Sequence, residues 1–374
     1  MKTKVAIACQ GGGSQTAFTA GVLKALSEAR LDDQFEFVGI SGTSGGALCA
    51  TLIWYSLRKG EQPVWKRLID FWRDNTAQTE TERLITRASI NWMRMVNRGM
   101  LPMFQTSPSS PMSRAISEMA AAGLRPEFGD FPKLLRKHID FDEIAAWGPQ
   151  PSAPVLVIGA ASVLSGRLRK FNSAKETIRI EHILASAAVP NLFPAVYLDG
   201  DALWDGLFSD NPPVDDLVRW RVVGEGNVPH EVWIIKINPT TRSAAPELPN
   251  EIADRRNQLE GNVSLFQNLK WIELFNDLIL EGAFKREFLH NRDVPEPVRI
   301  PKAFMSEPDK PYHIPWIEMS DEMQASLDYE GKLDRSPENV DALIAHGETQ
   351  GRLFLAERAR RVGEGGALAA REAG

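Results

Sequence analysis

The stretch that decides the fold is Gly42-Thr43-Ser44-Gly45-Gly46, which lies between an apolar run at residues 35–40 and a helix-like run at residues 47–56. A strand that turns sharply into a helix leaves no room for Cβ atoms beside the central serine, so glycines are needed there. The first amides of the helix would point at the Ser44 hydroxyl. Gly42, Gly45 and Gly46 therefore predict a nucleophile elbow around Ser44, with a tight turn of small residues as the simpler alternative.

A second glycine turn precedes the elbow. An apolar run at residues 4–9 predicts a buried strand, and it leads into Gly11, Gly12 and Gly13 and a helical stretch at residues 17–26. Unobstructed amides beside a nucleophile can form an oxyanion hole, which is worth about 10² to 10³ in rate per donor. The alternative is a nucleotide loop, but Thr16 occupies the third glycine position of that fingerprint.

A third motif completes a resemblance to a known family. Asp205-Gly206-Leu207 follows the elbow, and a small-residue stretch at residues 185–190 precedes it. In this order, the glycine loop, the serine elbow and the Asp-Gly motif resemble the patatin-like phospholipases, of the bacterial type with a C-terminal helical extension. The resemblance covers residues 2–237.

The resemblance implies both a fold and an activity. The fold would be α/β, a three-layer sandwich with a mostly parallel central sheet, a helical insertion and C-terminal helices. The activity would be hydrolysis of lipid acyl esters without a cofactor: Ser44 attacks, Asp205 takes its proton directly, and the Gly11–Gly13 loop holds the oxyanion. Because an exposed aspartate has a pKa of about 4, this dyad requires a desolvated Asp205 that touches Ser44.

Other partners for Ser44 remain open at this point. A Ser-Asp-His triad could use a late histidine, and Asp199-Gly200 repeats the dipeptide six residues before Asp205. We favour Asp205 because Asn211-Pro212 follows at a distance suited to the cap and first turn of a helix. The four histidines that come late enough are His230, His290, His313 and His346.

Two departures from the family pattern leave alternative functions open. The family usually carries a basic residue two places after the glycines, where this chain has Gln15, and a small residue at the position of Leu207. The same acyl-serine could instead serve an acyltransferase, or the chain could be a catalytically silent binding or regulatory protein. The sequence predicts neither the head group, nor the positional preference, nor the oligomeric state.

Composition excludes several classes of function. The 374 residues carry a formal charge of −6, and the pI is about 5.7, which argues against a nucleic-acid binder. Cys9 and Cys49 are the only cysteines, and both fall in apolar runs, so we expect two buried free thiols, no metal site and a reducing, cytoplasmic location. The short apolar run after Met1 predicts the first strand and not a signal peptide.

The chain divides into three parts by pattern. Residues 1–240 predict the hydrolase core, with residues 61–148 as a helical insertion and candidate lid; residues 241–374 predict a helical extension packed on the core. Strands are expected at residues 155–161, 166–171, 232–237 and 316–319, one or two helices at 251–288, a final helix at 340–361 and a frayed tail at 363–374.

One helix of the insertion is basic and amphipathic. Arg83, Arg87, Arg94 and Arg98 share a face within about 60° on a helical wheel, opposite six apolar residues. We expect the apolar face to pack on the core; the alternative is peripheral contact with an anionic membrane. The apolar residues are Leu84, Ile85, Trp92, Met93, Met95 and Val96.

Overall fold

The computed structural model describes most of the chain. The described residues are 2–29, 34–102, 107–111, 113–115, 118, 123–190, 192–294, 296–303, 307 and 310–372. Residues 103–106, 112, 116–117 and 119–122 of the expected insertion, and residues 373–374 of the expected tail, lie outside this set.

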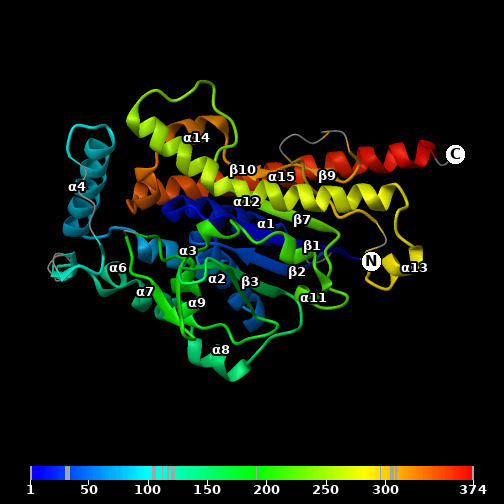
Figure 1. Cartoon of the computed structure of the whole chain (residues 1–374), viewed down its shortest axis with the longest axis horizontal. Helices are drawn as coiled ribbons and strands as arrows, with labels where there is room; N and C mark the ends of the chain where they lie inside the picture. Colours follow the sequence, from blue (N-terminus) through cyan, green and yellow to red (C-terminus); the bar gives the residue numbers. More distant parts are fainter. Residues whose placement is uncertain are drawn as a thin grey trace.

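A mostly parallel sheet forms the centre of the molecule (Figure 1). Its strand order is β10-β7-β1-β2-β3-β6-β5, and the first five of these strands run parallel. β4 and β6 pair antiparallel with β3, and β5 pairs antiparallel with β6. The bounds are β1 Thr3–Cys9, β2 Phe35–Gly42, β3 Val155–Ser162, β4 Leu168–Asn172, β5 Val196–Leu198, β6 Asp201–Asp205, β7 Glu231–Lys236 and β10 Ile317–Glu318.

Alternating apolar side chains of the sheet build two cores, one on each face. Ile7 and Ile158 belong to the core that packs against α1 Ala17–Glu28, α2 Gly45–Lys59, α3 Lys66–Asn75 and α9 Ile180–Ser186. Ala8 and Val157 belong to the other core, beneath α10 Asp215–Val218, α11 Trp220–Val223 and α12 Pro249–Leu280. Because both faces are covered, the central strands read as continuous apolar runs. The three-layer α/β architecture expected from the sequence is confirmed.

The insertion is partly built into the core. α3, α7 Phe131–His138 and α8 Phe141–Trp147 bury side chains such as Phe71, Leu134 and Ile144 in the first core, and α6 Pro126–Gly129 packs against α3 and α7. α4 Glu80–Asn97 lies at the end of the molecule opposite the C-terminus (Figure 1). The role of residues 61–148 as a lid stays a prediction.

α4 does not pack as the sequence analysis expected. Its buried residues are Glu82, Thr86 and Ile90, whereas Leu84 is 69% exposed and Trp92 55% exposed. The reason is that the Glu82 side chain has two sets of partners on the inner side of the helix. It completes the N-terminal capping box with Thr79, and its two oxygens accept hydrogen bonds from Nε of Arg125 at 2.9 and 3.1 Å. The side of the helix that carries Glu82 and Thr86 is therefore turned inward. The expected packing of the apolar face fails for Leu84, Trp92 and Met95, which are exposed, whereas Ile85, Met93 and Val96 are half-buried.

Residues beyond 240 wrap the core. α15 Pro337–Glu372 packs along α1, and Arg358 binds the fully buried Glu231 of β7 with two hydrogen bonds of 2.6 Å. The helix continues past the expected end at residue 361, because alanines and charged residues of high helix propensity follow its glycines. The remaining elements of the described residues are η1 Gly13–Thr16, η3 Gly206–Phe208, α13 Arg286–His290, β8 Ile300–Pro301, β9 His313–Ile314, α14 Asp321–Ser326 and η4 Glu330–Leu333.

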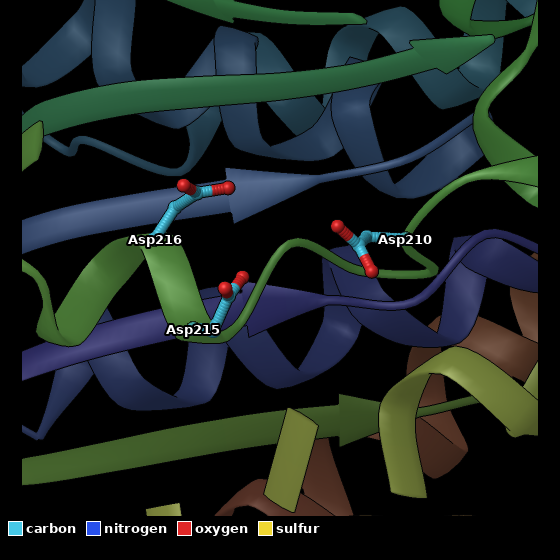
Figure 2. A group of neighbouring side chains, drawn as sticks. All are labelled: Asp210, Asp215 and Asp216. Atoms are coloured by element: carbon cyan, nitrogen blue, oxygen red, sulfur yellow. The ribbon is translucent and has the colours of Figure 1, made fainter. Parts of the chain in front are cut away.

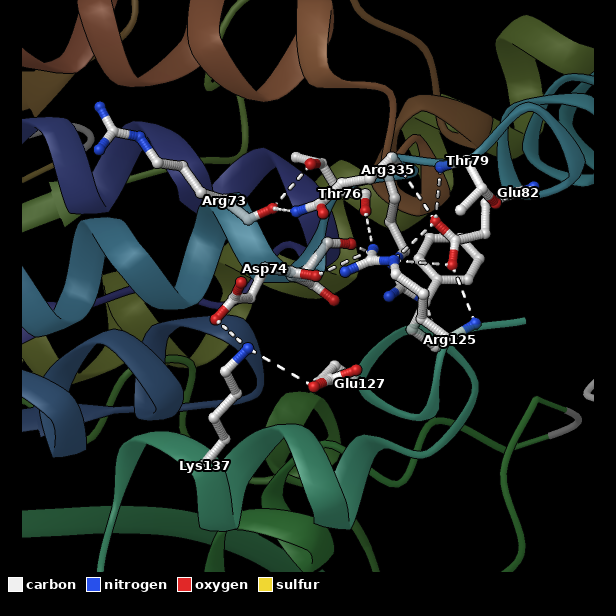
Figure 3. Close-up of polar contacts among 12 residues, drawn as sticks. Arg73, Asp74, Thr76, Thr79, Glu82, Arg125, Glu127, Lys137 and Arg335 are labelled. Carbon is white, nitrogen blue, oxygen red and sulfur yellow. Dashed lines mark hydrogen bonds and ion pairs between the residues drawn. The ribbon is translucent and has the colours of Figure 1, made fainter.

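A polar network ties the insertion to the segment before α15 (Figure 3). Arg335 donates to the carbonyl of Asn75 at 2.8 Å and to that of Phe128 at 3.1 Å. Arg125 donates to the carbonyl of Thr76 at 2.8 Å while it holds Glu82. The two arginines thus fix the ends of α3, α4 and α6 against the C-terminal part of the chain. The domain boundary at residue 240 stays a prediction.

Candidate active site

Ser44 lies at the turn between β2 and α2, at the carboxyl end of a central strand. Its φ is +55°, a strained value for a residue other than glycine. A Cβ atom on Gly46 would come within 2.7 Å of the Gln10 carbonyl oxygen and would also meet that of Cys9, so the helix can follow the strand this closely only with glycine there. The Ser44 amide donates to the Ser186 hydroxyl at 3.0 Å. The turn therefore holds the serine in one orientation.

The glycine loop after β1 lies beside Ser44. The Gly11 amide donates to Oδ1 of Asn211 at 2.7 Å, so it is already occupied. No acceptor among the described residues takes the amides of Gly12 and Gly13. The expectation that all three glycines donate to an oxyanion is therefore narrowed to Gly12 and Gly13.

Asp205 ends β6 and is 1% exposed. Its Oδ1 accepts a hydrogen bond from the Leu207 amide at 2.8 Å, whereas the buried Oδ2 accepts none of standard geometry from the described residues. Burial raises the pKa of Asp205 to about 7, and the Leu207 amide, the neighbouring Ser44 hydroxyl and the charge of Lys332 oppose this shift. One oxygen of the carboxylate is thus held in place and the other is open to a proton.

A cavity of about 90 Å³ joins these groups. Ser44, Asp205 and the glycine loop line it together with residues from the C-terminal part of the chain, which no motif in the sequence singled out. The other lining residues are Val189, Leu192, Leu207, Asn211, Asn238, Asn257, Tyr329, Lys332 and Leu333.

The alternative partners for Ser44 lie elsewhere. His230 accepts from the Lys4 amide, His313 contacts Glu273 at 3.0 Å, and His346 accepts from the Ser320 amide. No histidine is among the described residues that line the cavity. Asp199 pairs with Arg179 at 2.7 Å, and its side chain is 56% exposed. Neither the triad nor the Asp199 dipeptide therefore reaches the nucleophile.

Asn211 has a role that the sequence analysis did not foresee. It does not cap a helix, because α10 begins at Asp215 after Val214. Its side chain instead binds the Gly11 amide and donates to the Gly261 carbonyl at 3.2 Å. Gln10, which directly precedes the glycine loop, ties that loop to the end of β7: its Oε1 accepts hydrogen bonds from the amides of Ile237 and Asn238, both at 2.8 Å. The sequence analysis expected Asn211 only as a helix cap, and the fold shows that it holds the glycine loop instead.

Three carboxylates gather behind the elbow, where Asp215 and Asp216 of α10 approach Asp210 within 4.8 Å (Figure 2). Lys170 of β4 lies among them, 2.6 Å from Asp210 and 3.4 Å from Asp215, and in contact with Asp216. Burial lowers the pKa of Lys170, but the three carboxylates outweigh it and raise that pKa above its ordinary value. The positive charge of Lys170 thus neutralises part of the negative charge of the cluster. The cluster also anchors the loop that contains Asp210, whose backbone carbonyl accepts a hydrogen bond from the Thr43 hydroxyl at 2.5 Å.

Both cysteines are buried and free, as expected from the sequence. Cys9 ends β1, and Cys49 lies on the first turns of α2. Burial raises the pKa of the Cys9 thiol well above its ordinary value and that of Cys49 to about 12. Both therefore act as small apolar core residues.

Comparison with known proteins identifies the family. The sequence model described as patatin-like phospholipase matches residues 7–218, and the chain belongs to this family. Among solved structures, VipD from Legionella pneumophila aligns with 96% of this chain and 67% of its own, at 13% identity and a TM-score of 0.38. The ExoU–SpcU complex from the type III secretion system of Pseudomonas aeruginosa aligns with 79% of this chain and 57% of its own, at 16% identity and a TM-score of 0.25. A search of curated proteins gave no match.

Proposed function

We propose that this chain hydrolyses acyl esters of lipids with a Ser44–Asp205 dyad and an acyl-serine intermediate. The observation that carries the proposal is the state of Asp205: it is buried, its pKa is raised to about 7, and it lines the same cavity as the strained Ser44. Its Oδ2 accepts no hydrogen bond of standard geometry from the described residues. A carboxylate with that pKa is a suitable base near neutral pH. Family membership supports the substrate class.

The steps follow from the positions of these groups. Ser44 Oγ attacks the ester carbonyl while its proton passes to Asp205 Oδ2, and the amides of Gly12 and Gly13 stabilise the oxyanion. Collapse of this intermediate releases the alcohol, which takes the proton from Asp205. Water then loses a proton to Asp205 and attacks the acyl-serine. Collapse of this second intermediate breaks the bond from the acyl carbon to Ser44 Oγ, which takes the proton back from Asp205 as the fatty acid leaves.

A fluorophosphonate probe and a panel of lipid esters test the proposal. Wild type should release fatty acid and bind the probe at Ser44, whereas Ser44→Ala should do neither. Ser243→Ala, at an exposed serine that does not line the cavity, is the matched control and should behave as wild type. Full hydrolysis by Ser44→Ala would rule out the dyad, and acylation of an added alcohol in place of free fatty acid would show an acyltransferase. Failure of wild type to bind the probe would favour a catalytically silent protein.

We also propose that α4 contacts a membrane surface. Leu84 and Trp92 are more than half exposed, Met100 just after the helix is 66% exposed, and Arg87 and Arg98 are exposed near them. Apolar side chains beside arginines suit the interface of an anionic bilayer. The proposed contact is peripheral, through the exposed side of α4. No helix among the described residues could span a bilayer.

Sedimentation with vesicles of anionic phospholipid tests this contact. Trp92→Ser should lower the bound fraction at limiting lipid several-fold, because a large apolar side chain no longer enters the interface. Leu353→Ser is the matched control, since Leu353 is 56% exposed on α15. Equal binding of wild type and Trp92→Ser would contradict the proposal.

A further inference from the structure

Lys332 enters the candidate active site from outside the family region. It belongs to η4, more than a hundred residues after the matched residues 7–218, yet it lines the cavity together with Ser44 and Asp205. Its backbone packs directly on the glycine loop: Gly13 has a φ of +57°, and a Cβ atom there would collide with the Lys332 carbonyl oxygen. The loop is thus shaped to receive this segment.

The residue that replaces the family's usual basic residue lies at the same contact. Gln15 donates from Nε2 to the carbonyl of Asp328 at 3.1 Å, and this hydrogen bond joins the glycine loop to the start of η4. The loop therefore has a neutral side chain where a charge is usual, and the neutral side chain holds the segment that brings in Lys332. A positive charge reaches the cavity from a different part of the chain.

The ammonium of Lys332 is held by uncharged groups. It donates to Oδ1 of Asn238 at 2.8 Å and to Oδ1 of Asn257. An ammonium has three N–H donors, so one remains. Among the described residues no carboxylate pairs with it, because the neighbouring Asp254 binds Arg242. The two amides orient the charge without neutralising it.

The charge of Lys332 is sustained near neutral pH. Burial lowers its pKa to about 8, while the carboxylates of Asp254 and Asp205 oppose that shift. A cation that is withdrawn from water and has no bonded carboxylate gains most from an anionic ligand. Asp205 cannot be that ligand throughout the reaction, since its proposed role as the base makes it neutral in both tetrahedral intermediates.

We propose that Lys332 is a specificity-determining residue, which binds an anionic oxygen group of the substrate close to the scissile ester. The geometry favours acyl esters that carry a phosphate, or another oxyanion, near the acyl group over neutral acyl esters. This inference rests on the proposed hydrolase function and assigns a binding site within it. The C-terminal part of the chain thereby decides which ester the dyad receives.

The experiment compares two esters that differ only in the anion. Lysophosphatidic acid and monoacylglycerol with the same acyl chain are each presented at low mole fraction in micelles of a neutral detergent, so that the micelle surface carries little charge with either ester. Wild type should prefer the anionic ester, and Lys332→Met should lower the ratio of kcat/KM values by about 10- to 100-fold, the usual worth of a charge-assisted hydrogen bond. Lys332→Arg should recover most of that ratio. Lys270→Met, at an exposed lysine of α12, is the matched control.

Each outcome decides the inference. If kcat/KM in Lys332→Met is unchanged for both esters, or falls by the same factor for both, Lys332 does not determine selectivity. Its role would then be structural or in oxyanion stabilisation, and the hydrolase function would stand. Hydrolysis of neither ester by wild type would overturn both. If Lys332→Met does not fold, as judged by circular dichroism, Lys332→Gln supplies the same comparison with a polar end. Inorganic phosphate should inhibit wild type competitively and Lys332→Met less, which separates anion binding from a preference for the lipid surface.

Discussion

At the scale of single residues, the proposed dyad asks Asp205 to combine two properties that conflict in most proteins: it is almost fully buried, and it would act as a base. Burial alone would keep it neutral, and the Leu207 amide and the charge of Lys332 bring its pKa back to about 7. The burial that raises the pKa of Asp205 also lowers the free energy of unfolding when the carboxylate is charged, because the charged group loses its hydration there.

Asp205→Asn should therefore lose activity and gain stability. We expect kcat to fall by about 10³-fold or more, because the amide cannot take the Ser44 proton. The wild-type carboxyl has a pKa of about 7 when folded and about 4 when unfolded. The folded state thus holds the extra proton between these values, and stability falls as the pH rises through this window. The variant should be more stable than wild type at pH 8, by roughly 1–4 kcal/mol, and nearly equal at pH 4. Urea unfolding at both pH values checks this; near-normal turnover would point away from the dyad.

The two charges of the cavity predict the pH dependence. For a neutral ester, kcat/KM should rise with pH through about 7 as Asp205 loses its proton. In Lys332→Met this rise should move to higher pH, because the positive charge that lowers the pKa of Asp205 is gone. For an anionic ester, wild type should also lose activity above pH 8, where Lys332 becomes neutral. A rise at the same pH in both proteins would show that Lys332 does not act on Asp205.

At the scale of elements, the contact of α1 with α15 ties the C-terminal part to the core. Its closest points are glycines: a Cβ on Gly347 would collide with the carbonyl oxygen of Phe18, and one on Gly21 with that of Ile344. Glycine here allows the two helices to approach nearly backbone to backbone, and the η4 segment that carries Lys332 leads directly into α15.

Gly347→Leu should accordingly destabilise the protein. The added side chain would force the helices apart, at a cost of about 2–4 kcal/mol. Ala345→Leu, two residues away on the exposed side of α15, is the control and should change the free energy of unfolding by less than about 0.5 kcal/mol. Urea denaturation measures both, and equal stability of the two variants would show that the helices can separate without loss.

At the scale of the whole molecule, the cavity is assembled from distant parts of the chain. Two parallel strands supply the glycine loop and the elbow, an antiparallel strand supplies Asp205, and η4 supplies Lys332. Arg335 fixes that last segment against the insertion through the carbonyls of Asn75 and Phe128. The guanidinium also lies 3.7 Å from the centre of the Phe128 ring. Insertion and C-terminal segment are therefore coupled three residues from Lys332.

Arg335→Met should loosen this coupling. It leaves two carbonyls without their donor, which should cost about 2–4 kcal/mol. Amide hydrogen exchange should speed up in η4, and the preference for anionic over neutral esters should fall although Arg335 does not line the cavity. Arg352→Met, at a residue that is 61% exposed on α15, is the control. Unchanged exchange in η4 would show that the segment is held by other contacts.

Local sequence patterns predicted the layered α/β fold, which is confirmed, and placed the candidate nucleophile, the glycine loop and the aspartate at one cavity. These depend on local requirements: a strand-to-helix turn at Ser44 admits little but glycine beside it, and continuous apolar runs predict buried parallel strands. The sequence analysis expected the apolar face of α4 to pack inward. The side that carries Glu82 does so instead, because Glu82 binds Arg125, which lies 43 residues further along the chain. Two features depend on the three-dimensional arrangement: Asn211 accepts a hydrogen bond from the Gly11 amide, and Lys332 lines the cavity. Such contacts join residues hundreds of positions apart, and no spacing along the chain encodes them.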